Sequence, residues 1–162
     1  MESILASLPP ELAIVALAAL PVIELRGAVP LGLALGLHPA WVYLLAVVGN
    51  MLPIPFVYQL LIPVRRYLSA SPGMHRFVDR YLNQVLHRSA SVAKYGFWGL
   101  VVFVGVPLPG TGAWTGAIAA SLLGMRFRPA MVALTAGTML AGIVMLVLWF
   151  VGKLMGQGLL VP

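Results

Sequence analysis

Glu24 and Arg26 are the residues of this chain whose types and placement could do chemistry together. They are the only acid and base set close together in otherwise apolar sequence, between Pro21 and Pro30. An ionisable side chain at membrane depth costs about 3 kcal/mol on insertion scales, and such residues usually line a cavity or a substrate pathway. The pair therefore predicts a binding or proton-exchange site. The alternative is a structural ion pair that closes a turn, and such pairs are weak stabilisers.

The sequence around the pair predicts a broken helix. Pro21 removes a backbone donor, Gly27 frees the backbone, and Pro30 is expected to start a new helix. The run 12–23 would span about 18 Å as a helix, against a hydrocarbon core of about 30 Å, and the run 29–37 is similarly short. We therefore expect a hairpin that enters the membrane and returns, with the pair at its tip. Backbone outside a helix is tolerated there only where protein or water satisfies it.

Composition places the whole chain in the membrane. The 162 residues are 61% hydrophobic and 9% charged, with a mean hydropathy of +1.00, which excludes a soluble domain. The net charge of +6 does not indicate nucleic-acid binding, because the basic residues gather in one central segment and one turn. With no cysteine and no convincing nucleophile and base, we expect no enzyme, no catalytic residues, no metal site and no cofactor.

Residues 40–62 are long enough to cross the membrane and form the first predicted span. Pro53 and Pro55 should kink this helix. The carboxamide of Asn50 could reach the hairpin tip and bind a ligand, or it could form hydrogen bonds between helices.

Residues 63–94 form a predicted linker outside the bilayer, rich in arginine. Apolar residues at helical spacing over 74–86 predict an amphipathic helix that lies among anionic lipid headgroups. His75 and Asp79 have the spacing of a metal pair, but a solvated polar face is the preferred interpretation.

The second half of the chain repeats the plan of the first. A short apolar run over 95–106, a turn-rich stretch over 107–116 and a run over 117–124 precede a second span over 130–152. Pro21 and Pro109 are 88 positions apart, as are Gly36 and Gly124. We therefore predict one membrane domain over 1–162 with repeats at 11–62 and 95–156. The residues expected to shape the two tips are Pro21, Gly27, Pro30, Pro107, Pro109, Gly110, Gly112 and Gly116.

Counting crossings predicts that the repeats are inverted. A hairpin returns to its own side and the following helix crosses once, so the second repeat must have the opposite orientation, which is typical of transporters. Most basic residues fall on the side of the central linker. The positive-inside rule then predicts a multi-pass protein of the inner (cytoplasmic) membrane, with the linker in the cytoplasm and both termini outside. The predicted fold class is thus all-α integral membrane, with two re-entrant hairpins, two transmembrane helices and an interfacial helix.

Two stretches carry a resemblance to a known family. Residues 24–32, Glu-Leu-Arg-Gly-Ala-Val-Pro-Leu-Gly, and residues 107–116, Pro-Leu-Pro-Gly-Thr-Gly-Ala-Trp-Thr-Gly, resemble the signature stretches of the small multi-drug export proteins of bacteria and archaea. That family distantly resembles the DedA, or VTT-domain, proteins, which implies paired re-entrant hairpins and a role in moving phosphate-carrying lipids. DedA-like proteins typically place acids in the first hairpin and arginines in the second, whereas Glu24 and Arg26 share the first.

Two kinds of transport fit these residues. In the first, a transporter or flippase moves an amphiphilic or lipid-phosphate-like substrate: Arg26 holds its anionic group and Glu24 exchanges protons, because burial and a nearby arginine shift a carboxyl pKa in opposite directions. Neutral hydrogen bonds would come from Asn50, Thr111 and Thr115. In the second, an exporter of amphiphilic cationic drugs, Glu24 binds the cation and Trp114 stacks on it. A non-transporting membrane scaffold with a structural pair is the third alternative.

The expected partners are membrane lipids, a small amphiphilic substrate or lipid phosphate, and protons. A homodimer is a further expectation, because two spans and two short hairpins leave little protein to seal polar tips from lipid. Ala133, Gly137 and Ala141 lie four apart on one face of the last span, a spacing that permits close helix contact between chains or within one.

The predicted topology can be tested with single cysteines, since the chain has none. A cysteine at Ser89 should react with membrane-impermeant thiol reagents only from the cytoplasmic side, and one at Ser3 only from outside. Labelling of both positions from the same side would contradict the count of crossings and the inverted repeat.

Overall fold

The computed structural model describes residues 9–69, 90–108 and 110–158, and within these ranges every regular element is a helix. Two helical stretches are long and apolar enough to cross a membrane, Pro39–Leu61 and Phe127–Gly156. The predicted all-α membrane class is confirmed at this level. The interfacial helix expected over 74–86 lies outside the described residues.

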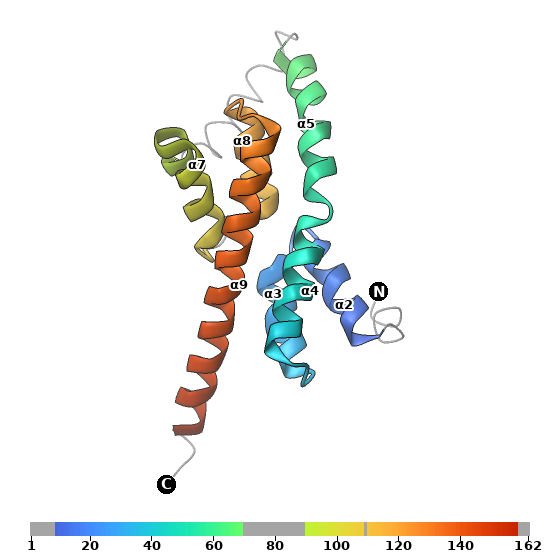
Figure 1. The fold of residues 1–162 in the computed structure, drawn as a ribbon, viewed down its shortest axis with the longest axis vertical. Helices are drawn as coiled ribbons and strands as arrows, with labels where there is room; N and C mark the ends of the chain where they lie inside the picture. The colour runs from blue at the N-terminus through green and yellow to red at the C-terminus, as the bar shows by residue number, and fades with distance from the viewer. Residues whose placement is uncertain (1–8, 70–89, 109, 159–162) are drawn as a thin grey trace.

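The first half of the chain forms a helical hairpin followed by a long broken helix (Figure 1). Its helices are α2 (Pro10–Ala19), α3 (Glu24–Ala34), α4 (Pro39–Met51) and α5 (Ile54–Ser69). Prolines at α2 and α4 stand in the first helical turn, where a missing N–H costs nothing. The chain bends at Leu52 and Pro53, between α4 and α5, so the kink predicted at Pro53 is present.

The second half has the same order of elements. Its helices are α7 (Ala90–Gly105), α8 (Ala113–Leu122) and α9 (Phe127–Gly158), and α7 contains a break at Gly96. Figure 1 shows α9 running in the direction opposite to α4 and α5. The turn at 35–38, which precedes α4, and the turn at 123–126, which precedes α9, lie at opposite ends of the molecule. The arms α2 and α8, each of 10 residues, are about 15 Å long, too short to cross a hydrocarbon core of about 30 Å.

The second arms of both hairpins end in the same way. Gly36 and Gly124 have positive φ angles of 79° and 70°. In each, the glycine N–H donates to the carbonyl three residues back and the following N–H donates to the carbonyl five residues back, at 3.0–3.2 Å. This is a Schellman motif, in which glycine takes the left-handed position without a steric penalty. Positions 88 residues apart in the two halves therefore make the same backbone hydrogen bonds at these helix ends.

The core consists of two clusters that share elements between the halves. The first joins α2, α3 and α4 through residues such as Ile14, Val29 and Val42, and includes Ala141 from α9. The second joins α7, α8 and α9 through residues such as Leu100 and Ala117, and includes Ile54 and Tyr58 from α5. Each hairpin therefore packs against its own long helix and receives side chains from the long helix of the other half.

Some predicted boundaries were wrong. Pro30 does not start a helix: it lies inside α3, which begins at Glu24. The turn before α3 is already helical in its hydrogen bonds, because the Glu24 N–H donates to the Leu20 carbonyl and the Gly27 N–H to the Ile23 carbonyl. Pro30 then removes only the bond that its N–H would make to the carbonyl of Arg26. Two long helices also exceed their predicted ends, since α5 continues to Ser69 and α9 to Gly158.

The small-residue face of α9 is used within the chain. Ala133 and Ala141 are buried, and a Cβ at Gly137 would lie 2.7 Å from Val104 and 2.9 Å from the Val101 carbonyl oxygen. This face therefore packs against α7 and the first cluster, so it no longer supports a homodimer. The homodimer itself stays a prediction.

Gly49 and Gly137, again 88 positions apart, should not tolerate a larger residue. A Cβ at Gly49 would lie 2.6 Å from the Val15 carbonyl oxygen at the crossing of α2 and α4, as one at Gly137 would meet α7. Because backbone must move, alanine at either position should destabilise the protein by about 1–3 kcal/mol. The measurement is thermal unfolding in detergent, with a lowered midpoint expected.

Gly152→Ala is the matched control for these two variants. A Cβ at Gly152 in α9 meets nothing within 4 Å, so helix propensity alone should make alanine neutral or stabilising by up to about 1 kcal/mol. Equal midpoints for all three variants would contradict the close helix crossings.

Candidate functional site

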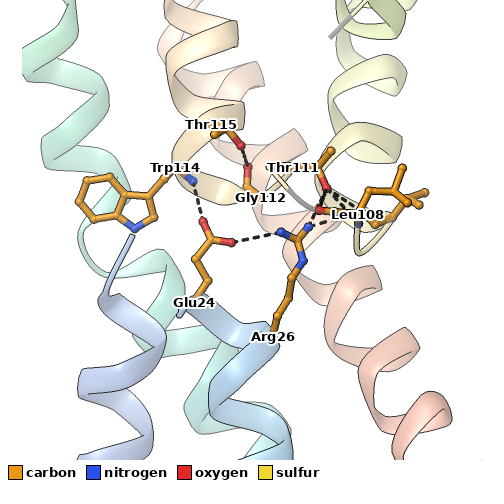
Figure 2. Close-up of polar contacts among 8 residues, drawn as sticks. Glu24, Arg26, Leu108, Thr111, Gly112, Trp114 and Thr115 are labelled. Atoms are coloured by element: carbon orange, nitrogen blue, oxygen red, sulfur yellow. Dashed lines mark hydrogen bonds and ion pairs between the residues drawn. The ribbon is translucent and has the colours of Figure 1, made fainter. Parts of the chain in front are cut away.

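The two hairpin tips meet at a set of polar contacts (Figure 2). Glu24 and Arg26 come from the start of α3, Thr111 from the loop between α7 and α8, and Trp114 and Thr115 from the first turn of α8. The structure thus brings five of the six predicted binding residues to the contact between the tips, and the sixth, Asn50, lies beside it. It does so because α3 packs against α9 while α8 packs against α5 and α9.

Arg26 is held by the loop of the second hairpin. Its Nη2 donates to Thr111 Oγ1 at 2.8 Å and to the Val106 carbonyl at 3.4 Å. The Thr111 hydroxyl in turn donates to the carbonyl oxygens of Val106, at 2.8 Å, and Leu108, at 2.9 Å. The guanidinium is therefore fixed on one edge by a short loop whose backbone is itself tied to the threonine.

Glu24 occupies the amino-terminal end of α8. The Trp114 N–H donates to Glu24 Oε1 at 3.4 Å, and Gly112, at the N-cap of α8, provides no capping side chain of its own. A carboxylate at this end of a helix interacts favourably with the helix dipole. The acid of the first hairpin thus caps the helix of the second.

Glu24 and Arg26 also interact with each other, but loosely. Arg26 Nη1 lies 3.6 Å from Glu24 Oε2, and the side chains are 22% and 9% exposed respectively. Glu24 has φ of 51°, a left-handed conformation that costs a residue other than glycine about 1–3 kcal/mol. The backbone is therefore held in a strained conformation at the position that places the carboxylate.

Gly112 is required by space rather than by backbone conformation. Its φ of 164° is ordinary extended backbone, but a Cβ there would collide with Glu24 Oε2 and would lie 2.7 Å from the carboxyl carbon. Gly110, by contrast, has φ of 80° in the loop before it. Gly116 lets α8 approach Val104 and Leu134 closely, and Gly27 faces the side chain of Ile23.

Two cavities adjoin the pair from different sides. The larger is open, about 420 Å³, and its polar lining consists of Glu24, Arg26, Thr111 and Thr115. Its other walls are Pro21, Val22, Ile23, Pro107, Leu108 and Gly110. Pro109 lies outside the described residues.

The smaller cavity is about 10 Å³, close to the space of one water molecule. Asn50 and Thr138 line it together with Glu24 and Arg26. Asn50 is buried, and its Oδ1, like Arg26 Nε, is a buried atom without a hydrogen-bond partner. Asn50 therefore lies beside the tip as predicted, on the internal side.

The position of Trp114 bears on the two kinds of transport considered above. Its backbone N–H contacts Glu24, but its indole ring extends away from Arg26 (Figure 2) and lines neither cavity. The ring packs instead against the second core cluster. Thr115 lines the open cavity, and its hydroxyl donates to the Gly112 carbonyl at 3.2 Å.

The sequence did not reveal every residue of the site. The Val106 carbonyl accepts hydrogen bonds from Arg26 and Thr111, and the Leu108 carbonyl accepts one from Thr111. Sequence analysis cannot identify such backbone acceptors, because they do not depend on the type of side chain. Thr138 could have been found, because it is a hydroxyl in an apolar span; it is fully buried and donates to Met51 Sδ at 3.5 Å. In the part of the chain that the structure describes, no group of three acidic, histidine or cysteine residues could hold a metal ion.

Comparison with known proteins places the chain in a family. The family described as "Putative small multi-drug export protein" matches residues 24–144, which include the residues of the site, the first long helix and the first part of α9. No curated protein and no solved structure matches the chain. The resemblance to DedA proteins is not supported by these comparisons and stays a prediction. Since the match covers most of the sequence, the chain belongs to the small multi-drug export protein family.

Proposed function

We propose that this protein is a transporter that carries a small amphiphilic substrate across the membrane through the site between its hairpin tips. The observation that carries the proposal is Arg26, a cation fixed by the second hairpin and exposed to an open, mostly apolar cavity. The family name supports membrane transport in general. Transport without chemical conversion is proposed, so the protein would not be an enzyme.

Alternating access would use two inverted repeats with re-entrant hairpins. This proposal is supported by the short arms α2 and α8, by the opposed directions of α4 and α9, and by the matching helix ends at Gly36 and Gly124. Inverted repeats meet at the membrane midplane in many transporters. The inner-membrane location, the cytoplasmic linker and the external termini belong to the same proposal.

Glu24 and Arg26 would divide the work of coupling. Arg26 binds the anionic group of the substrate, while Glu24 takes up and releases a proton as the tips open to one side and then to the other. A protonated Glu24 no longer compensates the charge of Arg26, from which it is 3.6 Å away. Binding of substrate and binding of the proton are therefore linked.

Of the alternatives, the exporter of cationic drugs has less support, because the Trp114 ring that would stack on a cation lies outside both cavities. A lipid phosphate is a special case of the anionic substrate, moved by a flippase that acts on the same site. The scaffold alternative leaves the open cavity and its guanidinium without a role.

Arg26→Lys should impair transport although the charge is kept. An ammonium cannot bond Thr111 and the Val106 carbonyl and also present a planar fork to an anion. Loss of one charge-assisted hydrogen bond, about 1.5–3 kcal/mol, should lower the transport rate about tenfold or more. Uptake into proteoliposomes measures this, with exposed Arg128→Lys as the matched control. Wild-type uptake by Arg26→Lys would mean that the pair is structural.

Glu24→Gln should leave the protein folded but remove the dependence of transport on a proton gradient. The amide can still accept the Trp114 N–H but cannot titrate. The measurement is uptake at several imposed pH gradients, with thermal unfolding as the test of folding. Glu11→Gln, on α2 and away from both cavities, is the control. Gradient-dependent uptake by Glu24→Gln would exclude Glu24 as the coupling group.

A further inference from the structure

The charges around the open cavity limit the substrate that it can hold. Among the described residues, Glu24 and Arg26 are the only ionisable side chains that line either cavity. The helices that pack against α3 carry Glu11 on α2, Tyr43 on α4, and Arg128 and Lys153 on α9, and α8 carries no ionisable residue. None of these lines either of the two cavities, so the charge of the site is set by one acid and one base.

The two groups present themselves to the cavity differently. Arg26 is the more exposed of the pair, and its hydrogen bond to Thr111 does not involve Glu24. Glu24 is nearly buried and is held against Gly112 and the Trp114 N–H. When Glu24 is ionised, an anion approaching Arg26 also meets the negative charge of the carboxylate. When Glu24 is protonated, the site carries a single uncompensated positive charge.

The rest of the open cavity suits an apolar body. Val22 is 91% exposed and Leu108 56% exposed at its rim, beside Pro21 and Pro107. A volume of about 420 Å³ is within the range of sites that hold small organic ligands. Thr115 offers a hydroxyl near the charged pair.

We propose, resting on the function proposed above, that this cavity binds an amphiphilic monoanion together with one proton on Glu24, so that the loaded site and the empty site both have zero net charge. The proton passes from water in the open cavity to the Glu24 carboxylate, and it leaves together with the anion on the other side. Transport is then electroneutral. A dianion would leave one uncompensated negative charge, and a cation would meet Arg26.

Binding tests the charge class without requiring transport. The probes are octanesulfonate and octyltrimethylammonium, whose charges do not change between pH 5.5 and 8, titrated by calorimetry into the full-length protein in phosphatidylcholine nanodiscs. The wild-type protein should bind octanesulfonate at least tenfold more tightly at pH 5.5 than at pH 8. Glu24→Gln should bind it equally well at both pH values, and Arg26→Gln should lose at least tenfold at pH 5.5. Empty nanodiscs, Glu11→Gln and Arg128→Gln are the controls.

A second comparison identifies the source of the anion. Weaker octanesulfonate binding in phosphatidylglycerol than in phosphatidylcholine nanodiscs, both at about 1 M salt so that repulsion of the probe by the anionic surface is screened, would show that a lipid headgroup supplies the same monoanionic group. Unchanged binding would favour a free amphiphile. Either result agrees with the charge class. Tighter binding of octyltrimethylammonium, or octanesulfonate affinity that does not change with pH in the wild-type protein, would overturn it.

Proteoliposomes test electroneutrality. Net octanesulfonate uptake by the wild-type protein should change less than twofold when valinomycin and a potassium gradient impose an inside-negative potential. Uptake by Glu24→Gln should fall severalfold, because the anion then crosses without a proton. Potential-dependent uptake by the wild-type protein would overturn the inference but leave transport itself established. Tight, pH-dependent binding without any transport would instead overturn the proposed transport function, while the monoanion-binding site would stay supported.

Discussion

The contact between the two hairpin tips is the interaction on which the rest of the structure depends. The polar groups at each hairpin tip find hydrogen-bond partners in the other hairpin. Arg26 donates to Thr111 and the Val106 carbonyl, and the first turn of α8 donates to the carboxylate of Glu24. An unpaired charge or helix end that is buried away from water is costly. The tips are therefore stable together, and separating them exposes charges that only water, protons or a ligand could satisfy. A site built in this way is suited to changing partners.

Close helix crossings give the tips a rigid support. Gly49 brings α4 against the backbone of α2, and Gly137 brings α9 against the backbone of α7. Between helices in a membrane, such packing is one of the main sources of association energy, since lipid is as apolar as the helix surfaces. The many exposed apolar side chains, among them Phe56 and Leu154, agree with a lipid environment. The close helix crossings therefore support the tips, where the two charged groups lie 3.6 Å apart.

The sequence predicted the helical class and the two spans, and it placed Glu24, Arg26 and Thr111 at opposed hairpin tips, because charges and glycines in apolar sequence are conspicuous. It could not predict that α3 begins at Glu24, since that start depends on hydrogen bonds in the preceding turn. Nor could it locate the Trp114 ring, because an indole fits both a ligand site and a core. The face formed by Ala133, Gly137 and Ala141 was equally ambiguous, because small residues permit contact within a chain as well as between chains.

The contact between Glu24 and Gly112 has a further meaning if the halves are inverted repeats, as we propose. These positions are also 88 apart, so they are equivalent in the two repeats. Equivalent positions related by a two-fold axis touch each other only near that axis. Two glutamates there would collide and repel, whereas a glutamate fits against a residue without a side chain. The same offset relates Arg26 to Trp114. A charged pair at the centre of such a protein therefore requires that the repeats differ, with the charges in one tip and the space and backbone donors in the other.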